Sequence, residues 1–286
     1  MDRFPPPYSL PWDLHPLLPG GDGTGRTLPA ALQPGRLVVS DKGAGEPAFW
    51  LSDGPADYYL WKRLLAEHQQ TGFWPLLLGS DDEGGPWATG EVSFEGVTSP
   101  ADHDPEAVLR EWWYRYVVLG PVDTAPFGAD WPAGRAPTPL QRSDPGYAAE
   151  NFGGSLLYDD DLSRLRLGLV AASSADSVAA IGWREVADHT TDVAEISAVL
   201  RDWERRYGTR VVAIDDGALH LSVSAPPGNR DEALRVAAEH YAFCPEDTWE
   251  TTDALIDNKI TPCSGTVLAE YAETLINQPI WFFHWY

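Results

Sequence analysis

One stretch, DVAEISAVLRDWERRYG, constrains the fold more than any other part of this sequence. Its apolar side chains recur at helical spacing and form one stripe, made of Val193, Ile196, Leu200, Trp203 and Tyr207. Asp192 and Glu195 are typical of the capping box that starts a helix, and Gly208 is typical of the glycine that ends one. The stretch therefore predicts an amphipathic helix whose stripe packs against a second layer.

The residues around this helix predict the rest of the C-terminal fold. TRVVAID and ALHLSVSA follow as strands, and the Asp216-Gly217 pair between them favours a tight hairpin turn. A strand, RLRLGLVAA, precedes the helix; two helices, NRDEALRVAAEHYAFC and GTVLAEYAETLINQ, and a strand, PIWFFHWY, come after the hairpin. The order β-α-β-β-α-α-β predicts an α+β domain over residues 161–286. With the extra helix set aside, this is the order of the ferredoxin-like, split βαβ arrangement.

The N-terminal part of the sequence predicts a smaller α/β unit. Residues 1–35 are rich in Pro and Gly and predict an extended arm. Residues 36–120 contain strand-like segments and two helical ones, DYYLWKRLLAEHQQTG and DPEAVLREWWYRYVVL. Residues 121–160 carry many Pro and Gly and little periodicity, which predicts a linker between two domains.

The charge balance excludes some partners and favours others. The chain has 43 Asp and Glu residues against 20 Lys and Arg residues, which gives a net charge of -23. This excess repels phosphate backbones and anionic lipid surfaces, so we expect neither nucleic acid nor a membrane as a partner. A basic protein is the partner that the charge favours, while solubility is the simpler explanation of the same charge.

Compartment and source follow from other features of the composition. No segment approaches the run of about 18 apolar residues that crosses a bilayer, and prolines interrupt the N-terminal stretch where a secretory signal needs such a run. Two cysteines, Cys244 and Cys263, do not make a disulfide framework. We therefore expect a cytoplasmic protein, and the excess of Arg over Lys together with abundant Ala, Gly and Pro is typical of bacterial genes rich in G and C.

The stretch AAEHYAFCPEDTWE gathers side chains that bind metals or act in catalysis. His240 and Cys244 share a helix face and would form a Cys2His2 set with Cys263 and His284, but the spacing differs from that of zinc fingers, so we predict no metal and no cofactor. Cys244 lies at the C-terminal end of a helix, where the helix dipole opposes a thiolate. We therefore predict an inert, buried cysteine and no catalytic residue.

Three functions remain open at this level. The first is a non-catalytic, acidic protein-interaction or accessory module, of which an antidote-like protein that binds a basic enzyme is one example. The alternative is a small-ligand-binding protein or an enzyme, with a pocket between the two parts of the chain that uses His240 and Asp247. The third is a scaffold without a dedicated site. The residues that we predict to line such a pocket are His240, Asp247, Trp249, Glu111 and Trp112.

The C-terminal third resembles a known bacterial family. RVVAIDDGALHLSVSAPP, EALRVAAEHYAFCPEDTW and LAEYAETLINQPIWFFHWY are similar to a domain of unknown function, number four-two-five-three, that is common in actinobacteria. Phe243-Cys244-Pro245, followed by an acidic residue and then Trp249, is the most specific element. The resemblance spans residues 165–286, and GFWPLLL and EWWYRY resemble the N-terminal extension of longer members. It implies a fold and a compartment but no activity, cofactor or catalytic residue.

Overall fold

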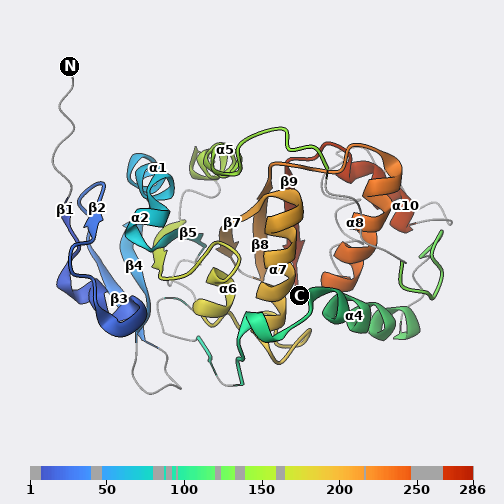
Figure 1. Ribbon diagram of the computed structural model, residues 1–286, viewed down its shortest axis with the longest axis horizontal. Coiled ribbons are helices and arrows are strands. Elements are labelled where there is room, and N and C mark those ends of the chain that lie inside the picture. The colour runs from blue at the N-terminus through green and yellow to red at the C-terminus, as the bar shows by residue number, and fades with distance from the viewer. Residues whose placement is uncertain are drawn as a thin grey trace.

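A seven-stranded mixed sheet runs through the molecule, with helices on both of its faces (Figure 1). The computed structural model describes residues 8–39, 47–79, 87, 92–94, 96–119, 124–132, 139–158, 165–215, 217–245 and 267–285. The strands in spatial order are β3 (Gly35–Val39), β4 (Pro47–Pro55), β6 (Arg166–Val170), β5 (Trp74–Leu78), β7 (Thr209–Asp215), β8 (Ala218–Val223) and β9 (Ile280–His284). The mixture of helices and strands confirms the α+β class.

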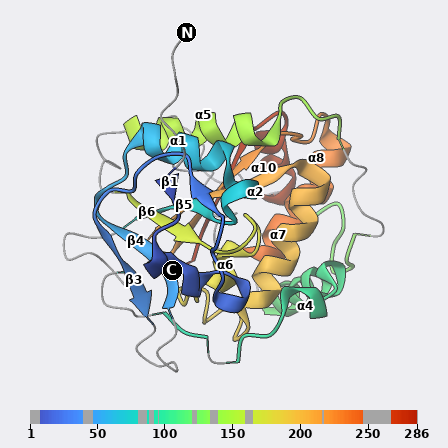
Figure 2. The same cartoon turned by 60° about the vertical axis from the view of Figure 1, so that its left-hand side comes forward.

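The helices fall into two groups, one on each face of the sheet. Those described are α1 (Tyr58–Ala66), α2 (His68–Thr71), α4 (Pro105–Leu119), α5 (Pro145–Tyr158), α6 (Ser177–Ala180), α7 (Val193–Tyr207), α8 (Arg230–Phe243) and α10 (Val267–Leu275). Helices α1 and α5 pack on one face, against β5, β7 and β8. Helix α7 packs on the other face, α4 crosses α7 and α8, and α10 lies against α8 (Figure 2).

The alternation of side chains along β9 shows how the sheet separates these two groups. Trp281 packs against Trp203 of α7, with ring centroids 5.5 Å apart. Its neighbour Phe282 points to the opposite face, where it contacts His220 at 4.9 Å, and His220 in turn lies 6.2 Å from Phe152 of α5. Successive residues of a strand face opposite sides, so one apolar strand serves both layers.

The ends of α7 form largely as the sequence predicts. The Asp192 carboxylate accepts a hydrogen bond from the backbone N–H of Ala194 at 3.0 Å, and Gly208 ends the helix with a φ of 60°. The second half of the predicted capping box does not form, because Glu195 accepts a hydrogen bond from the Thr190 hydroxyl at 2.6 Å. The cap therefore depends on Asp192 alone.

The strand order rules out the ferredoxin-like arrangement. Strand β5 lies between β6 and β7, antiparallel to β6 and parallel to β7. Strands β6 and β7 consequently run in opposite directions, and the β6–α7–β7 segment is not a parallel βαβ unit. Every residue of β5 is buried, as expected for an apolar strand in the centre of a sheet covered on both faces. The order of elements in the C-terminal part of the sequence does not show that β5, a strand of the N-terminal part, lies between β6 and β7.

The predicted division of the chain into residues 36–120, a linker over 121–160 and a domain over 161–286 does not match the way in which the described residues pack. The described residues of 36–120 and 161–286 share one sheet and one hydrophobic core, because β5 belongs to the first part while its neighbours belong to the second. The range 121–160, predicted as a linker, contains α5, which packs against α1 and the sheet. Its periodicity is hard to recognise because Gly and Ala occupy much of the face that packs closely.

The N-terminal arm, predicted over residues 1–35, is also more ordered than expected in its described part. Short strands β1 (Tyr8–Ser9) and β2 (Thr27–Leu28) pair with each other, and 3₁₀ helices cover Trp12–Leu17 and Pro19–Gly21. The arm contributes four buried leucines to the core: Leu10, Leu14, Leu18 and Leu28. Burial of these side chains fixes the arm in spite of its Pro and Gly content.

Gly153 of α5 lies at a close contact between α5 and α1. A Cβ atom at this position would lie 2.2 Å from the ring of Trp61, which is buried and donates its indole N–H to the carbonyl of Pro75 at 3.0 Å. We expect Gly153→Ala to lower the free energy of unfolding by about 1–2 kcal/mol, since overpacking outweighs the gain in helix propensity. Urea unfolding measures the change.

The neighbouring glycine provides the matched control. A Cβ atom at Gly154 would lie 3.2 Å from the ring of Tyr58, which is only partly buried and has room to move. Gly154→Ala should therefore leave the unfolding midpoint nearly unchanged. Equal effects of the two substitutions would contradict a close contact between Gly153 and Trp61.

Candidate functional site

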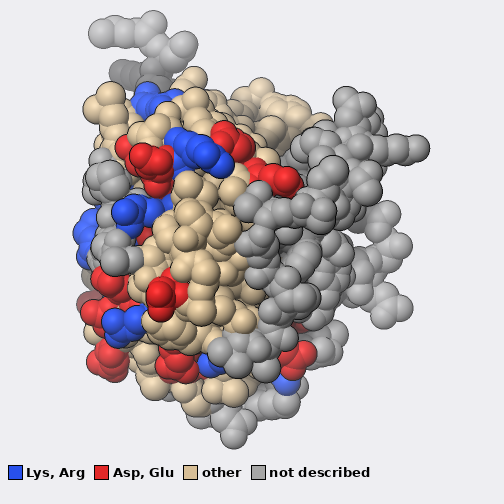
Figure 3. Space-filling model, turned by 90° about the vertical axis from the view of Figure 1, so that its right-hand side faces the viewer, with Lys and Arg blue, Asp and Glu red and all other residues tan. Residues whose placement is uncertain are grey.

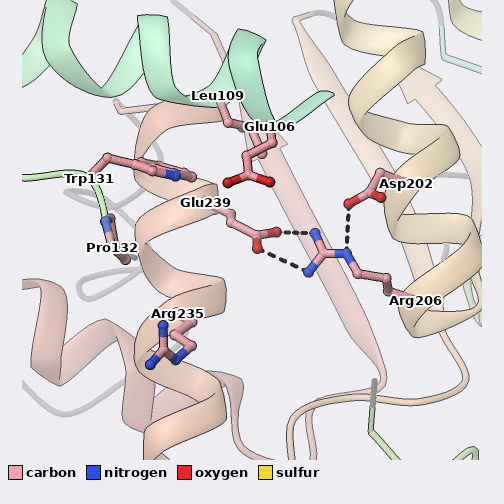
Figure 4. A pocket seen from close by; sticks show the side chains of 8 residues that line it. All are labelled: Glu106, Leu109, Trp131, Pro132, Asp202, Arg206, Arg235 and Glu239. Carbon is pink, nitrogen blue, oxygen red and sulfur yellow. Dashed lines mark hydrogen bonds and ion pairs between the residues drawn. The ribbon is translucent and has the colours of Figure 1, made fainter. Parts of the chain in front are cut away.

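A charged hollow lies where α4, α7 and α8 meet (Figure 4). Its lining residues are Glu106, Leu109, Trp131, Pro132, Asp202, Arg206, Arg235 and Glu239. Figure 4 shows the Arg206 guanidinium extending from α7 toward Glu239 on α8, while Trp131 and Pro132 form the opposite wall. The free space between these side chains is narrow.

Arg206 is held by two buried carboxylates. Its Nε donates to Asp202 Oδ2 at 2.6 Å, and its Nη1 and Nη2 donate to the two oxygens of Glu239 at 3.0 and 2.5 Å. Trp203 also donates its indole N–H to Glu239 at 2.8 Å, and Tyr207 accepts a hydrogen bond from Arg206 Nη1 at 2.5 Å. Such bidentate pairs fix geometry as well as charge, so this network sets the position of α7 against α8.

The electrostatics of this network keep the guanidinium charged. Burial by itself lowers the pKa of Arg206, but the Glu239 carboxylate more than compensates and leaves that pKa above its ordinary value. Burial, followed by the charge of Glu239, raises the pKa of the Tyr207 hydroxyl. Neither side chain therefore exchanges protons near neutral pH. Arg206 and Tyr207 therefore act in this network as fixed hydrogen-bonding groups.

The predicted site residue His240 is wholly buried in an aromatic cluster beside this network. Its ring lies 4.4 Å from that of Trp281 and 5.1 Å from that of Trp203, and its Nδ1 is 2.8 Å from the hydroxyl of Tyr271. Burial, and then the nearby charge of Arg206, lowers the pKa of His240 well below its ordinary range. The imidazole is therefore neutral, and solvent does not reach it.

Of the other predicted site residues, Trp112 and Glu111 are described, and neither lines a cavity together with His240. Trp112 is buried and lies 4.4 Å from the ring of His189 and 6.2 Å from that of Phe243. Glu111 points outward, with a side chain 72% exposed and paired with Arg115. Asp247 and Trp249 lie outside the described residues. The hollow where α4 and α8 meet is lined instead by residues near these in sequence, such as Leu109 and Glu239.

Sequence reasoning missed a second buried histidine. His189 is 5% exposed, its Nδ1 lies 2.6 Å from the Tyr116 hydroxyl, and Arg115 donates to its backbone carbonyl at 2.8 Å. Burial, and then the charge of Arg115, lowers the pKa of His189 to about 3. The segment REVADHTTD has no clear periodicity, so its sequence does not predict this burial. The charged network has one signal in the sequence: Asp202 and Arg206 are four residues apart, next to the apolar stripe of α7, and this spacing favours an ion pair along the helix.

Cys244 ends α8 as a buried thiol, as predicted. Its S–H donates to the backbone carbonyl of His284 at 3.2 Å, and its backbone N–H donates to the carbonyl of His240. Cys263, the other cysteine of the Cys2His2 set that we considered, lies outside the described residues. Within the described ranges, no three His, Cys, Asp or Glu side chains are placed to hold a metal ion.

A larger cleft lies on the opposite side of the sheet, between α2 and the start of α5. Its open space, including the mouth, is about 1080 Å³, and its charged side chains are Glu67, Asp144, Glu150 and Arg210. Tyr147 of α5 lines this cleft and also a second hollow of about 540 Å³ on the other side of α5, next to Phe152 and Ile280. The cleft brings together segments from both halves of the chain, which no local motif reveals.

No helix among the described residues combines the length and apolar character of a membrane crossing. No curated protein and no solved structure matches the chain. Residues 166–286 match a family described as a domain of unknown function, DUF4253, and this match begins at β6 and thus leaves out β5, which the sheet places between β6 and β7. The match confirms the resemblance of the C-terminal part of the chain to this family.

Proposed function

We propose that this chain is a non-catalytic binding module that recognises a basic segment of a partner protein along α5. The observation that carries the proposal is the position of Tyr147. This side chain is 58% exposed and stands between a polar cleft and an apolar hollow, so that the two form adjoining binding surfaces. Exposed tyrosines with apolar and polar neighbours are frequent anchors of protein interfaces.

The chemistry of the two hollows favours a basic and apolar segment. The polar cleft contains the carboxylates of Glu67, Asp144 and Glu150, of which Glu150 pairs with Lys62 at 2.5 Å. The one arginine in its described lining, Arg210, pairs with Glu204 at 3.2 Å. The second hollow has no charged side chain among its described lining and is bounded by Phe152, Pro279 and Ile280. A Lys or Arg side chain in the first and an aliphatic side chain in the second would satisfy both.

Charge over the whole chain supports the same partner. A net charge of -23 attracts a basic protein over a distance of about a Debye length and speeds its association. Among the described residues on the face shown in Figure 3, acidic and basic side chains are interspersed among uncharged ones. The cleft along α5 thus offers a local acidic site within a generally acidic molecule.

A small polar ligand is the other occupant that the cleft suits. His68 lines the cleft, with its ring edge-on to that of Trp74 and the ring centroids 5.0 Å apart. The sequence left open a small-ligand-binding protein or enzyme that uses His240 and Asp247. A ligand in this cleft would contact His68 instead of those two residues. The binding experiment below separates the two, because a small ligand needs the cleft but not the apolar hollow.

Tyr147→Ala should weaken binding of a basic, apolar peptide by about tenfold, which corresponds to about 1.4 kcal/mol. The probes are short fluorescein-labelled peptides that combine Arg with Leu, measured by fluorescence anisotropy. Their affinity for the unmodified protein should fall as salt is raised, because the carboxylates of the cleft attract the Arg side chains.

Tyr114 provides the matched control for this substitution. It is 46% exposed and belongs to α4, which lies on the opposite side of the molecule from α5 in Figures 1 and 2. Tyr114→Ala should leave peptide affinity unchanged. Equal loss in both variants, or equal binding of peptides with Glu in place of Arg, would rule out α5 as the recognition surface. Binding that requires Arg but not Leu would favour the small-ligand alternative.

A further inference from the structure

A separate pocket lies on the other side of the sheet, between the turn after α6 and the start of α7. Its open space is about 650 Å³. It is lined by Ser93, Val97, Trp183, Arg184, Val186, Ala187, Thr190, Thr191 and Val193. No acidic side chain occurs among these described lining residues, although acidic residues outnumber basic ones about two to one in the whole chain.

The nearest carboxylates of α7 are already engaged. Asp192 accepts hydrogen bonds from the backbone N–H and hydroxyl of Thr98, at 3.2 and 2.6 Å, besides capping α7. Glu195 accepts the hydroxyl hydrogen bond of Thr190. Arg184, by contrast, is exposed at the pocket and has no ion-pair partner among the described residues. Its guanidinium is therefore available to an anion.

The wall of the pocket contains one buried hydrogen-bond donor, the Trp183 indole N–H, that lacks an acceptor among the described residues. Trp183 is 2% exposed, and its indole N–H has no partner among the described residues. Trp285 packs edge-on against it, with ring centroids 5.4 Å apart, and its indole N–H also lacks a partner. The Nε2 of His189, whose ring lies 6.2 Å from that of Trp285, is a third buried atom without a described partner; His189 and Trp285 lie behind Trp183 and are not among the residues that line the pocket. An indole N–H is only a donor, so only a group with acceptor oxygens satisfies it.

We propose that this pocket binds a small amphipathic carboxylate. Val97, Val186 and Val193 contact its apolar body, and Arg184 binds the carboxylate through its paired N–H groups. A turn of the Trp183 indole then lets its N–H donate to a carboxylate oxygen. Pairing removes the cost of a buried donor without an acceptor, which is about 1–3 kcal/mol for such a group. The pocket is separate from the α5 surface, so this inference does not depend on the proposed partner.

Isothermal titration calorimetry of the full chain tests the proposal with defined probes. The probes are benzoate and hexanoate, their uncharged amides, and inorganic phosphate. We expect saturable binding of at least one carboxylate, and binding weaker by about tenfold for its amide and for phosphate, which lacks an apolar body. Arg184→Gln should weaken carboxylate binding by about tenfold, and Trp183→Phe, which keeps a ring but removes the N–H, by about fivefold.

Arg230→Gln removes an exposed arginine that pairs with Glu273 between α8 and α10, and it should leave carboxylate binding unchanged. Circular dichroism of each variant checks that the fold is retained. The proposal is overturned if no carboxylate binds saturably, if amide or phosphate binds as tightly as the carboxylate, or if Arg184→Gln binds like the unmodified protein.

Discussion

Replacing Arg206 with methionine is expected to lower the free energy of unfolding by about 3–5 kcal/mol. The substitution removes the cation that Asp202 and Glu239 share, and these side chains are 3% and 5% exposed. Two carboxylates would then remain buried without their counter-charge, and the Trp203 indole N–H would be the remaining described donor to Glu239. Urea unfolding at neutral pH, followed by tryptophan fluorescence, measures the difference.

The adjacent Arg205 is the matched control. It also pairs with Asp202, but its side chain is 68% exposed, so Arg205→Met should change stability by less than about 1 kcal/mol. Combining Arg206→Met with Glu239→Met should recover part of the loss, since the double variant no longer buries the Glu239 carboxylate. Equal losses at Arg205 and Arg206 would mean that the burial of the network contributes nothing.

Stability should fall in mild acid because of the two buried histidines. The unfolded pKa of His189 is 6.5 and its folded pKa is about 3, so below pH 6.5 the unfolded state binds a proton that the folded state does not. The contribution of His189 is fully present above that pH and is lost as the pH falls toward 3, by about 1.4 kcal/mol for each pH unit. His240, whose pKa is also lowered by burial, acts in the same direction.

Urea unfolding at a series of pH values between 7 and 5 checks this expectation. The free energy of unfolding should fall by about 2 kcal/mol between pH 6.5 and 5 through His189 alone. His189→Phe keeps a ring in the aromatic cluster and removes this titration, so its stability should depend less steeply on pH. The same slope in the variant and in the unmodified protein would show that His189 does not remain neutral in the folded state.

The sequence by itself determined the local features of this protein. Asp192 caps α7 and Gly208 ends it; Asn229 caps α8 by accepting a hydrogen bond from Glu232; and Cys244 ends α8 as a buried thiol. Each of these features depends on hydrogen bonds or conformations within a few residues, which the amino-acid types control directly. The same holds for the β7–β8 hairpin, in which Gly217 adopts a φ of 74°.

Only the tertiary structure decided which distant segments meet. Leu77 and Leu78 of β5 pair with Ala213 and Ile214 of β7, so an N-terminal strand becomes part of the sheet that the C-terminal domain builds. A strand's pattern shows that it is buried but not which neighbour pairs with it. The energy of such a pairing depends on the loops that must close and on how every other layer packs.

In the candidate sites too, the sequence determines the chemistry of each side chain and the tertiary structure determines its surroundings. His240 has the chemistry of a site residue, yet its cluster with Trp203 and Trp281 buries it in the core. Arg206 and Glu239 are 33 residues apart, and they meet because α7 and α8 pack on the same face of the sheet. The sequence supplies the charge of each side chain and its place on a helix. Burial and partners are set by the packing of whole elements, and these decide whether a charged group is held, hidden or free to bind.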